Sequence, residues 1–107
     1  MTYTPSKDLV PFASPGGAST ASIAAGVATP TVVKASAGRL CKVVLTTAAS
    51  VAAVSIFDNA AAASGTIIGF IASTAVAGAV IDFQMPAANG ITVGGAATNP
   101  AMTISFD

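Results

Sequence analysis

Residues 59–81 read NAAAASGTIIGFIASTAVAGAVI, a stretch without a single charge that begins after Asp58 and ends before Asp82. As one helix, a stretch of this length could cross the hydrocarbon core of a bilayer. As two strands and their connections, it would be part of a small β-sandwich. The fold class therefore depends on how this stretch is interpreted.

Turn-forming residues inside the stretch favour the second interpretation. Asp58 and Asn59 can cap a short helical turn over residues 60–63, and Gly65 can end that turn because glycine readily adopts the left-handed conformation. The residues that follow predict a strand over 66–73 and the entry to another at 79, which we expect to form an uncharged hairpin. A membrane-spanning helix normally has Lys or Arg at its flanks and Trp or Tyr at its ends, and this stretch has neither. We therefore expect no membrane contact.

The chain from residue 20 onward repeats one pattern, in which short apolar runs alternate with turn residues. The predicted strands are 21–27, 31–35, 38–46, 51–57, 66–73, 79–85, 91–94 and 101–106. Several short strands at intervals of about 8–12 residues are typical of an all-β sandwich or barrel. The sequence therefore predicts an all-β domain, a small β-sandwich or jelly-roll-like barrel of about eight short strands.

Period-two alternation assigns side chains to the two faces of the predicted strands. The predicted inner-face residues are Ile81, Phe83 and Met85 in one strand and Met102, Ile104 and Phe106 in another. Asn89 and Gly90 predict a tight turn with positive φ between two strands. The strands should therefore be half-buried, with an outer surface formed largely by Ser and Thr.

Residues 1–19 differ from the domain that we expect over 20–107. They contain Pro5, Pro11 and Pro15, which disfavour regular structure. They also contain four large apolar side chains, namely Tyr3, Leu9, Val10 and Phe12. We expect an extended N-terminal arm that uses these four residues to bind a neighbouring protein, with docking onto its own domain as the alternative.

Charged residues make up only 7% of the chain, and its formal net charge is zero. A soluble protein surface commonly carries roughly 25–35% charged residues, and a net charge near zero favours association. The one cluster of charges is Lys34, Arg39 and Lys42, which could contact an acidic partner surface or could simply be solvated. Three cations are too few to predict nucleic-acid binding. Lys34 and Lys42 could also protect exposed strands from edge-to-edge pairing.

The residues that enzymes and metal sites use are almost absent. The chain has no His and no Glu, and its four Asp are scattered. No nucleophile–base pair and no metal-ligand spacing can be found, so we expect neither an enzyme nor a cofactor. The single cysteine, Cys41, lies among apolar residues and is predicted to be buried. The absence of Trp and the single Tyr argue against a carbohydrate-binding module.

The chain over residues 38–106 resembles the small β-rich virion proteins of tailed bacteriophages, the capsid decoration or cement type. The segments that carry the resemblance are GRL at 38–40 with the strand that follows to 46, VSIFDNAAAASGTII at 54–68, NGITV at 89–93 and PAMTISF at 100–106. The resemblance implies a non-enzymatic subunit, often a homotrimer, with an N-terminal arm that clamps neighbouring capsomers.

The N-terminus lacks the basic start and apolar core of a secretory signal, so we expect the protein to stay where it is made or in a particle that it joins. Together with the resemblance, this places it on the capsid surface of a virion after synthesis in the host cytoplasm. Its partners would be the major capsid protein and further copies of itself. Two alternatives stay open: another virion component, such as a head-fibre base, neck or tail protein, and a membrane-spanning coat-like or holin-like protein.

Overall fold

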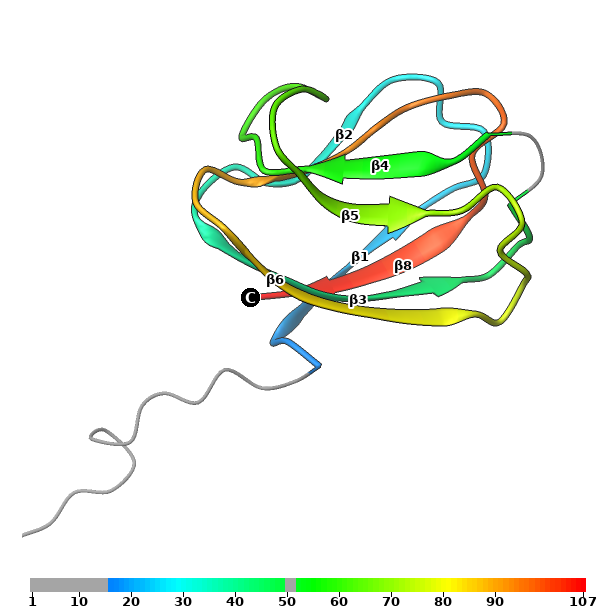
Figure 1. Ribbon diagram of the computed structural model, residues 1–107, viewed down its shortest axis with the longest axis horizontal. Coiled ribbons are helices and arrows are strands. Elements are labelled where there is room, and N and C mark those ends of the chain that lie inside the picture. Colours follow the sequence, from blue (N-terminus) through cyan, green and yellow to red (C-terminus); the bar gives the residue numbers. More distant parts are fainter. Residues whose placement is uncertain (1–15, 50–51) are drawn as a thin grey trace, which may run out of the picture.

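The computed structural model describes residues 16–49 and 52–107, which form eight β-strands and no helix (Figure 1). The strands are β1 (Ser19–Ile23), β2 (Thr31–Lys34), β3 (Gly38–Leu45), β4 (Val54–Phe57), β5 (Ile67–Ile71), β6 (Val80–Ala87), β7 (Ile91–Val93) and β8 (Met102–Phe106). All eight predicted strands are present, with ends that differ by a few residues.

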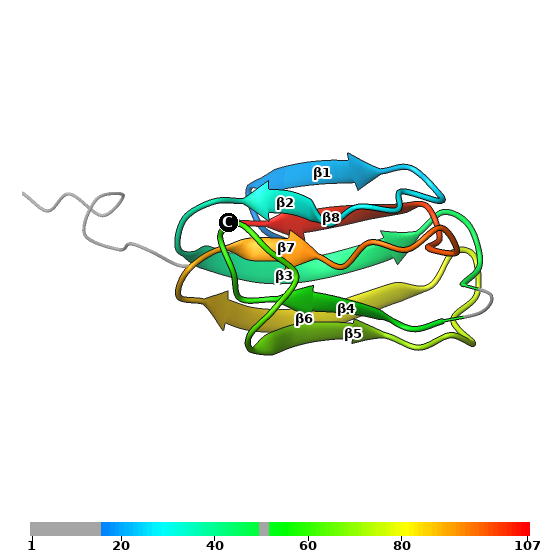
Figure 2. The ribbon, with the colours of Figure 1, turned by 90° about the horizontal axis from the view of Figure 1, so that it is seen from above.

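The strands form two antiparallel sheets of four strands each, which lie face to face (Figures 1 and 2). Sheet A has the order β1-β8-β3-β6, and sheet B has the order β2-β7-β4-β5. The pairs β1–β8, β2–β7, β3–β6 and β4–β5 are those of one long hairpin wound into a sandwich. This is the jelly-roll arrangement, so the predicted fold class is confirmed.

The core lies between the inner faces of the two sheets. Its largest fully buried side chains include Leu40, Leu45, Ile56, Ile71, Ile91, Met102 and Ile104. Burial of each such side chain contributes roughly 1.5–3 kcal/mol relative to leaving it in water. The predicted inner face of β8 is confirmed, since Met102 and Ile104 are buried and Phe106 packs against the same cluster.

The inner face of β6 is confirmed in part. Ile81 and Phe83 are half-buried and pack against the core, but Met85 is 40% exposed. Met85 lies at an edge of the sandwich, where no further strand covers it. Gln84 beside it has a φ of 52°, and the register of β3 with β6 shifts at this point. A sequence period cannot foresee such a bulge.

Two expectations for residues 59–81 are wrong. Residues 60–63 form bends and not a helical turn, although the Asn59 Oδ1 does accept hydrogen bonds from the N–H groups of Ala61 and Ala62, both at 2.8 Å. The strands β5 and β6 do not form a hairpin, because β5 pairs with β4 in sheet B and β6 pairs with β3 in sheet A. Gly65 has a positive φ of 96°, as expected. No helix in the described part of the chain is long and apolar enough to span a bilayer.

The turn at Asn89 and Gly90 is also built differently from the expectation, since neither residue is among those with positive φ in the described ranges. The Asp58 carboxylate accepts hydrogen bonds from the N–H groups of Ala88, Asn89 and Gly90 at 3.0, 2.7 and 3.3 Å. Gly90 is required for a different reason, because an added Cβ would lie 2.6 Å from the backbone oxygen of Lys34. Side-chain capping and close approach thus replace the expected backbone conformation.

Candidate partner-binding surface

The outer face of sheet A is nearly neutral and is formed largely by small polar side chains. Two cross-strand rows run over it: Thr20, Ser105, Lys42 and Asp82, and beside them Ser22, Thr103, Val44 and Val80. Lys42 and Asp82 are direct neighbours on adjacent strands, so the positive charge of one compensates the negative charge of the other. This face therefore presents hydroxyl groups and valines with almost no net charge.

The outer face of sheet B carries an apolar strip, formed by Val32, Phe57, Ile67 and Phe70. Val32, Ile67 and Phe70 are 42%, 51% and 55% exposed. Thr92 lies within the same row but is buried, and its Oγ1 donates a hydrogen bond to the backbone oxygen of Asn59 at 2.7 Å. Exposed apolar side chains that cluster on one face are a common feature of protein contact sites.

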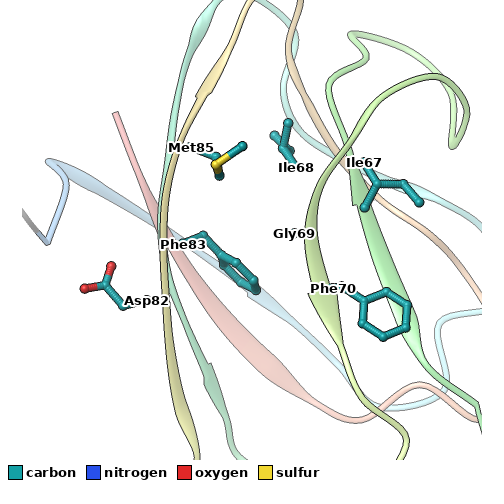
Figure 3. A pocket seen from close by; sticks show the side chains of 7 residues that line it. All are labelled: Ile67, Ile68, Gly69, Phe70, Asp82, Phe83 and Met85. Atoms are coloured by element: carbon teal, nitrogen blue, oxygen red, sulfur yellow. The ribbon is translucent and has the colours of Figure 1, made fainter.

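An edge groove of about 350 Å³ opens between β5 and β6, the edge strands of the two sheets on one side of the sandwich (Figure 3). It is lined by Ile67, Ile68, Gly69, Phe70, Asp82, Phe83 and Met85. The side chains of Phe83 and Met85 extend from β6 towards β5, whereas the Asp82 carboxylate points away from the groove (Figure 3). The side chains that extend from β6 into the groove are therefore apolar.

The three predicted contact cations each lie beside an acidic residue of the same subunit. Arg39 is engaged inside the subunit, because its Nη2 lies 2.5 Å from the Asp107 Oδ2 and its Nη1 donates a hydrogen bond to the Gln84 Oε1. Lys34 lies close to Asp107 as well. Lys42 is paired across the strands with Asp82, whose Oδ1 accepts a hydrogen bond from the Gln84 Nε2 at 2.8 Å, so Gln84 links the neighbourhoods of Arg39 and Lys42. The hydrogen bond from Arg39 is the main cause that lowers the pKa of Asp107, and Lys34 adds to it.

The expected protection of strand edges holds for only one of the two lysines. Lys34 lies on β2, which is an edge strand of sheet B. Lys42 lies on β3, which is flanked by β8 and β6 within sheet A, so it protects no edge. The four apolar residues predicted to contact a partner, Tyr3, Leu9, Val10 and Phe12, lie outside the described residues.

Sequence reasoning did not identify the apolar strip or the edge groove. The run at 66–73 is apolar at successive positions, and such a run does not show which face of its strand is covered. The structure exposes Ile67 and Phe70 because β5 is an edge strand whose outer face is uncovered. The lack of polar alternation was the available signal, but the position of a strand within its sheet is not encoded in its own residues.

The described residues offer little reactive chemistry. Cys41 is fully buried, as predicted, and Gly17 lies against its thiol. Burial is the main cause that raises the pKa of this thiol, which disfavours the reactive thiolate. Within residues 16–49 and 52–107, no group of three or more His, Cys, Asp or Glu side chains could hold a metal ion.

Comparison of the chain with protein-family models, with curated proteins and with solved structures finds no match in any of the three. Three surfaces of the described residues are candidates for binding a partner. These are the neutral outer face of sheet A, the apolar strip on sheet B and the edge groove between β5 and β6.

Proposed function

We propose that this chain is a bacteriophage capsid decoration protein, a non-enzymatic subunit that binds the assembled head and stabilises it. The observation that carries the proposal is the low charge of both sheet faces. The two cross-strand rows of sheet A contain one cation, Lys42, and one anion, Asp82, which face each other on adjacent strands. The apolar strip contains no charged residue. Hydroxyl and apolar groups can be buried against another protein at far lower cost than ions.

The fold and the sequence resemblance support the same proposal. Jelly-roll sandwiches occur in viral capsid proteins, but also in lectins and cupins, so the fold alone does not give a function. The resemblance to phage virion proteins over residues 38–106 narrows the choice to a subunit on a capsid surface. The partners would be the major capsid protein and other copies of this chain, with a homotrimer as the favoured assembly.

Stabilisation by such a subunit follows from thermodynamic linkage. A protein that binds the assembled shell but not the dissociated capsid subunits favours the shell by RT ln(1 + [L]/Kd), which is about 2.7 kcal/mol per site at 100 times the Kd. Many sites on one particle add their contributions. No catalytic group is needed for this activity, and the surface only has to recognise neighbouring capsid subunits in their assembled arrangement.

The test uses purified heads that lack the protein, to which the full chain is added before sedimentation and heating. We expect the chain to sediment with the heads and to raise the temperature at which they release DNA. Val32→Lys adds a charge to the apolar strip and should abolish both effects. Val76→Lys is the matched control, because Val76 is 64% exposed and lies outside the strip.

Two results would contradict the proposal in different ways. If Val32→Lys protects heads as well as the unchanged chain, the apolar strip is not the shell-binding face. If the chain does not sediment with heads at all, the decoration role is wrong. A density map of the intact virion separates decoration from the neck or tail alternative, because copies would cover the shell in the first case and surround one vertex in the second.

A further inference from the structure

The turn between β6 and β7 contains the one Asn-Gly pair of the chain, Asn89 and Gly90. We propose that Asn89 is a site of spontaneous deamidation, and that the Asp58 carboxylate suppresses this reaction in the folded subunit by holding the turn closed. The modification then occurs only when the turn opens. The inference concerns the subunit alone and does not depend on binding to a capsid.

The reaction needs only these two residues and water. The Gly90 backbone nitrogen gives up its proton and attacks the Asn89 Cγ, which forms a new N–C bond and closes a cyclic imide. The bond from Cγ to the side-chain nitrogen breaks, and this nitrogen takes up the proton and leaves as ammonia. Water then opens the imide at either of its carbonyl carbons, which gives aspartate or isoaspartate. A glycine after the asparagine favours ring closure, because no Cβ hinders the movement of its nitrogen towards Cγ.

The two other asparagines of the chain are poor candidates for the same reaction. Asn99 precedes Pro100, whose nitrogen carries no hydrogen and cannot close the ring in this way. Asn59 precedes Ala60, whose Cβ hinders ring closure. The Asn59 side chain is also engaged, because its Nδ2 donates a hydrogen bond to the Ser64 backbone oxygen at 3.1 Å. We therefore expect the modification at the Asn-Gly pair alone.

The Asp58 carboxylate holds the groups that would react. It accepts hydrogen bonds from three successive N–H groups, those of Ala88, Asn89 and Gly90, at 3.0, 2.7 and 3.3 Å. The Gly90 N–H is the group that must lose its proton, and a negative charge on that nitrogen would lie beside a negatively charged carboxylate. A hydrogen bond from the Asn89 side chain also helps to lower the pKa of Asp58, so the same carboxylate holds the amide that would leave.

Close packing also restricts the movement that ring closure requires. Gly90 is buried, and an added Cβ there would lie 2.6 Å from the Lys34 backbone oxygen, 2.8 Å from the Ala60 Cα and 2.9 Å from the Asn59 backbone oxygen. The Gly90 backbone therefore has little room to turn its nitrogen towards Cγ. Asn89 itself is exposed, so water reaches the imide once it has formed. The turn thus combines a reactive sequence with a closed conformation that opposes the reaction.

The test measures the rate of deamidation in the full chain during storage in a mildly alkaline buffer. After digestion, mass spectrometry detects the mass increase that accompanies the change of the Asn89 amide to a carboxyl group. Asp58→Ala should react at least about tenfold faster than the unchanged chain, because losing one charge-assisted hydrogen bond raises the population of the open turn by roughly that factor. Asp82→Ala is the control and should react at the unchanged rate, since this exposed carboxylate accepts a hydrogen bond from Gln84 and not from the turn.

A second comparison separates opening of the turn from unfolding of the whole domain. The unchanged chain is unfolded in urea, where we expect Asn89 to react fastest. The rate in urea, multiplied by the unfolded fraction that the urea curve of Asp58→Ala gives in native buffer, is the rate expected from global unfolding alone. The measured rate of Asp58→Ala should exceed this product, because a single turn opens at a lower free-energy cost than the domain unfolds.

Each of four outcomes would overturn the proposal. Equal rates in Asp58→Ala and the unchanged chain would mean that the carboxylate does not control the reaction. A slower rate in Asp58→Ala would mean that the carboxylate promotes the reaction, as a base that removes the Gly90 proton. A rate in Asp58→Ala that only matches the product for global unfolding would mean that the cap does not act on the turn locally. A rate in urea no higher than in native buffer would mean that the closed turn does not suppress deamidation.

Discussion

The strand register of the jelly roll can be tested at β8, where successive residues face opposite sides of sheet A. Ile104 is fully buried and pairs with Ala21 of β1 and Val43 of β3. Ile104→Ala removes three carbon atoms, which is about 2.4 kcal/mol of transfer free energy at about 0.8 kcal/mol each. The cavity that remains adds to this value, because close-packed neighbouring strands relax only in part. We expect the free energy of unfolding to fall by about 3–4.5 kcal/mol.

The measurement is urea unfolding of the full chain followed by far-UV circular dichroism. The midpoint should fall while the slope with denaturant stays constant. Thr103→Ala is the control, because Thr103 lies on the outer face and its truncation should change stability by no more than about 0.5 kcal/mol. A larger loss for Thr103→Ala than for Ile104→Ala would refute the register, since a slip of one residue exchanges the two faces of a strand.

Two further predictions concern acid stability and close backbone packing. The pKa of Asp58 is lowered mainly by the backbone N–H groups of Asn89 and Ala88, and that of Asp107 mainly by Arg39. The stability that both carboxylates contribute is complete above their unfolded pKa and is lost as the pH falls through the lowered folded pKa. Asp58→Asn should therefore reduce the dependence of the unfolding free energy on pH below about pH 4. An unchanged dependence on pH would contradict the role of Asp58 as a cap. Gly95→Ala should cost at least about 2 kcal/mol, because its Cβ would lie 2.2 Å from the Thr29 carbonyl carbon. Gly16→Ala, which has no atom within 4 Å of its added Cβ, should unfold at the same urea concentration as the unchanged chain.

Strand positions and most inner faces could be predicted because they depend on local periodicity. The alternation at 101–106 is enough to bury Met102 and Ile104, whatever strands lie beside them. Sheet membership depends on the whole chain, which explains why β5 and β6 were expected to pair and instead lie in different sheets. The bulge at Gln84 and the cap by Asp58 depend on contacts that are distant in sequence. Neither leaves a pattern in neighbouring residues.

The candidate contact surface was less predictable than the fold. Low charge suggested neutral outer faces, but the sequence could not show that Lys34, Arg39 and Lys42 each lie beside an acidic residue of the same subunit. Arg39 in fact pairs with Asp107, which is 68 positions away. The exposure of Ile67 and Phe70 follows from the edge position of β5, which no local pattern specifies.

The pairing of β1 with β8 has a consequence for how the protein folds. β8 (Met102–Phe106) lies inside sheet A between β1 and β3, so a strand that begins at Ser19 pairs with one that lies far along the chain. Pairing between residues so distant in sequence is slow, because much of the chain entropy is lost before these contacts form. We therefore expect the closure of sheet A around β8 to limit the folding rate.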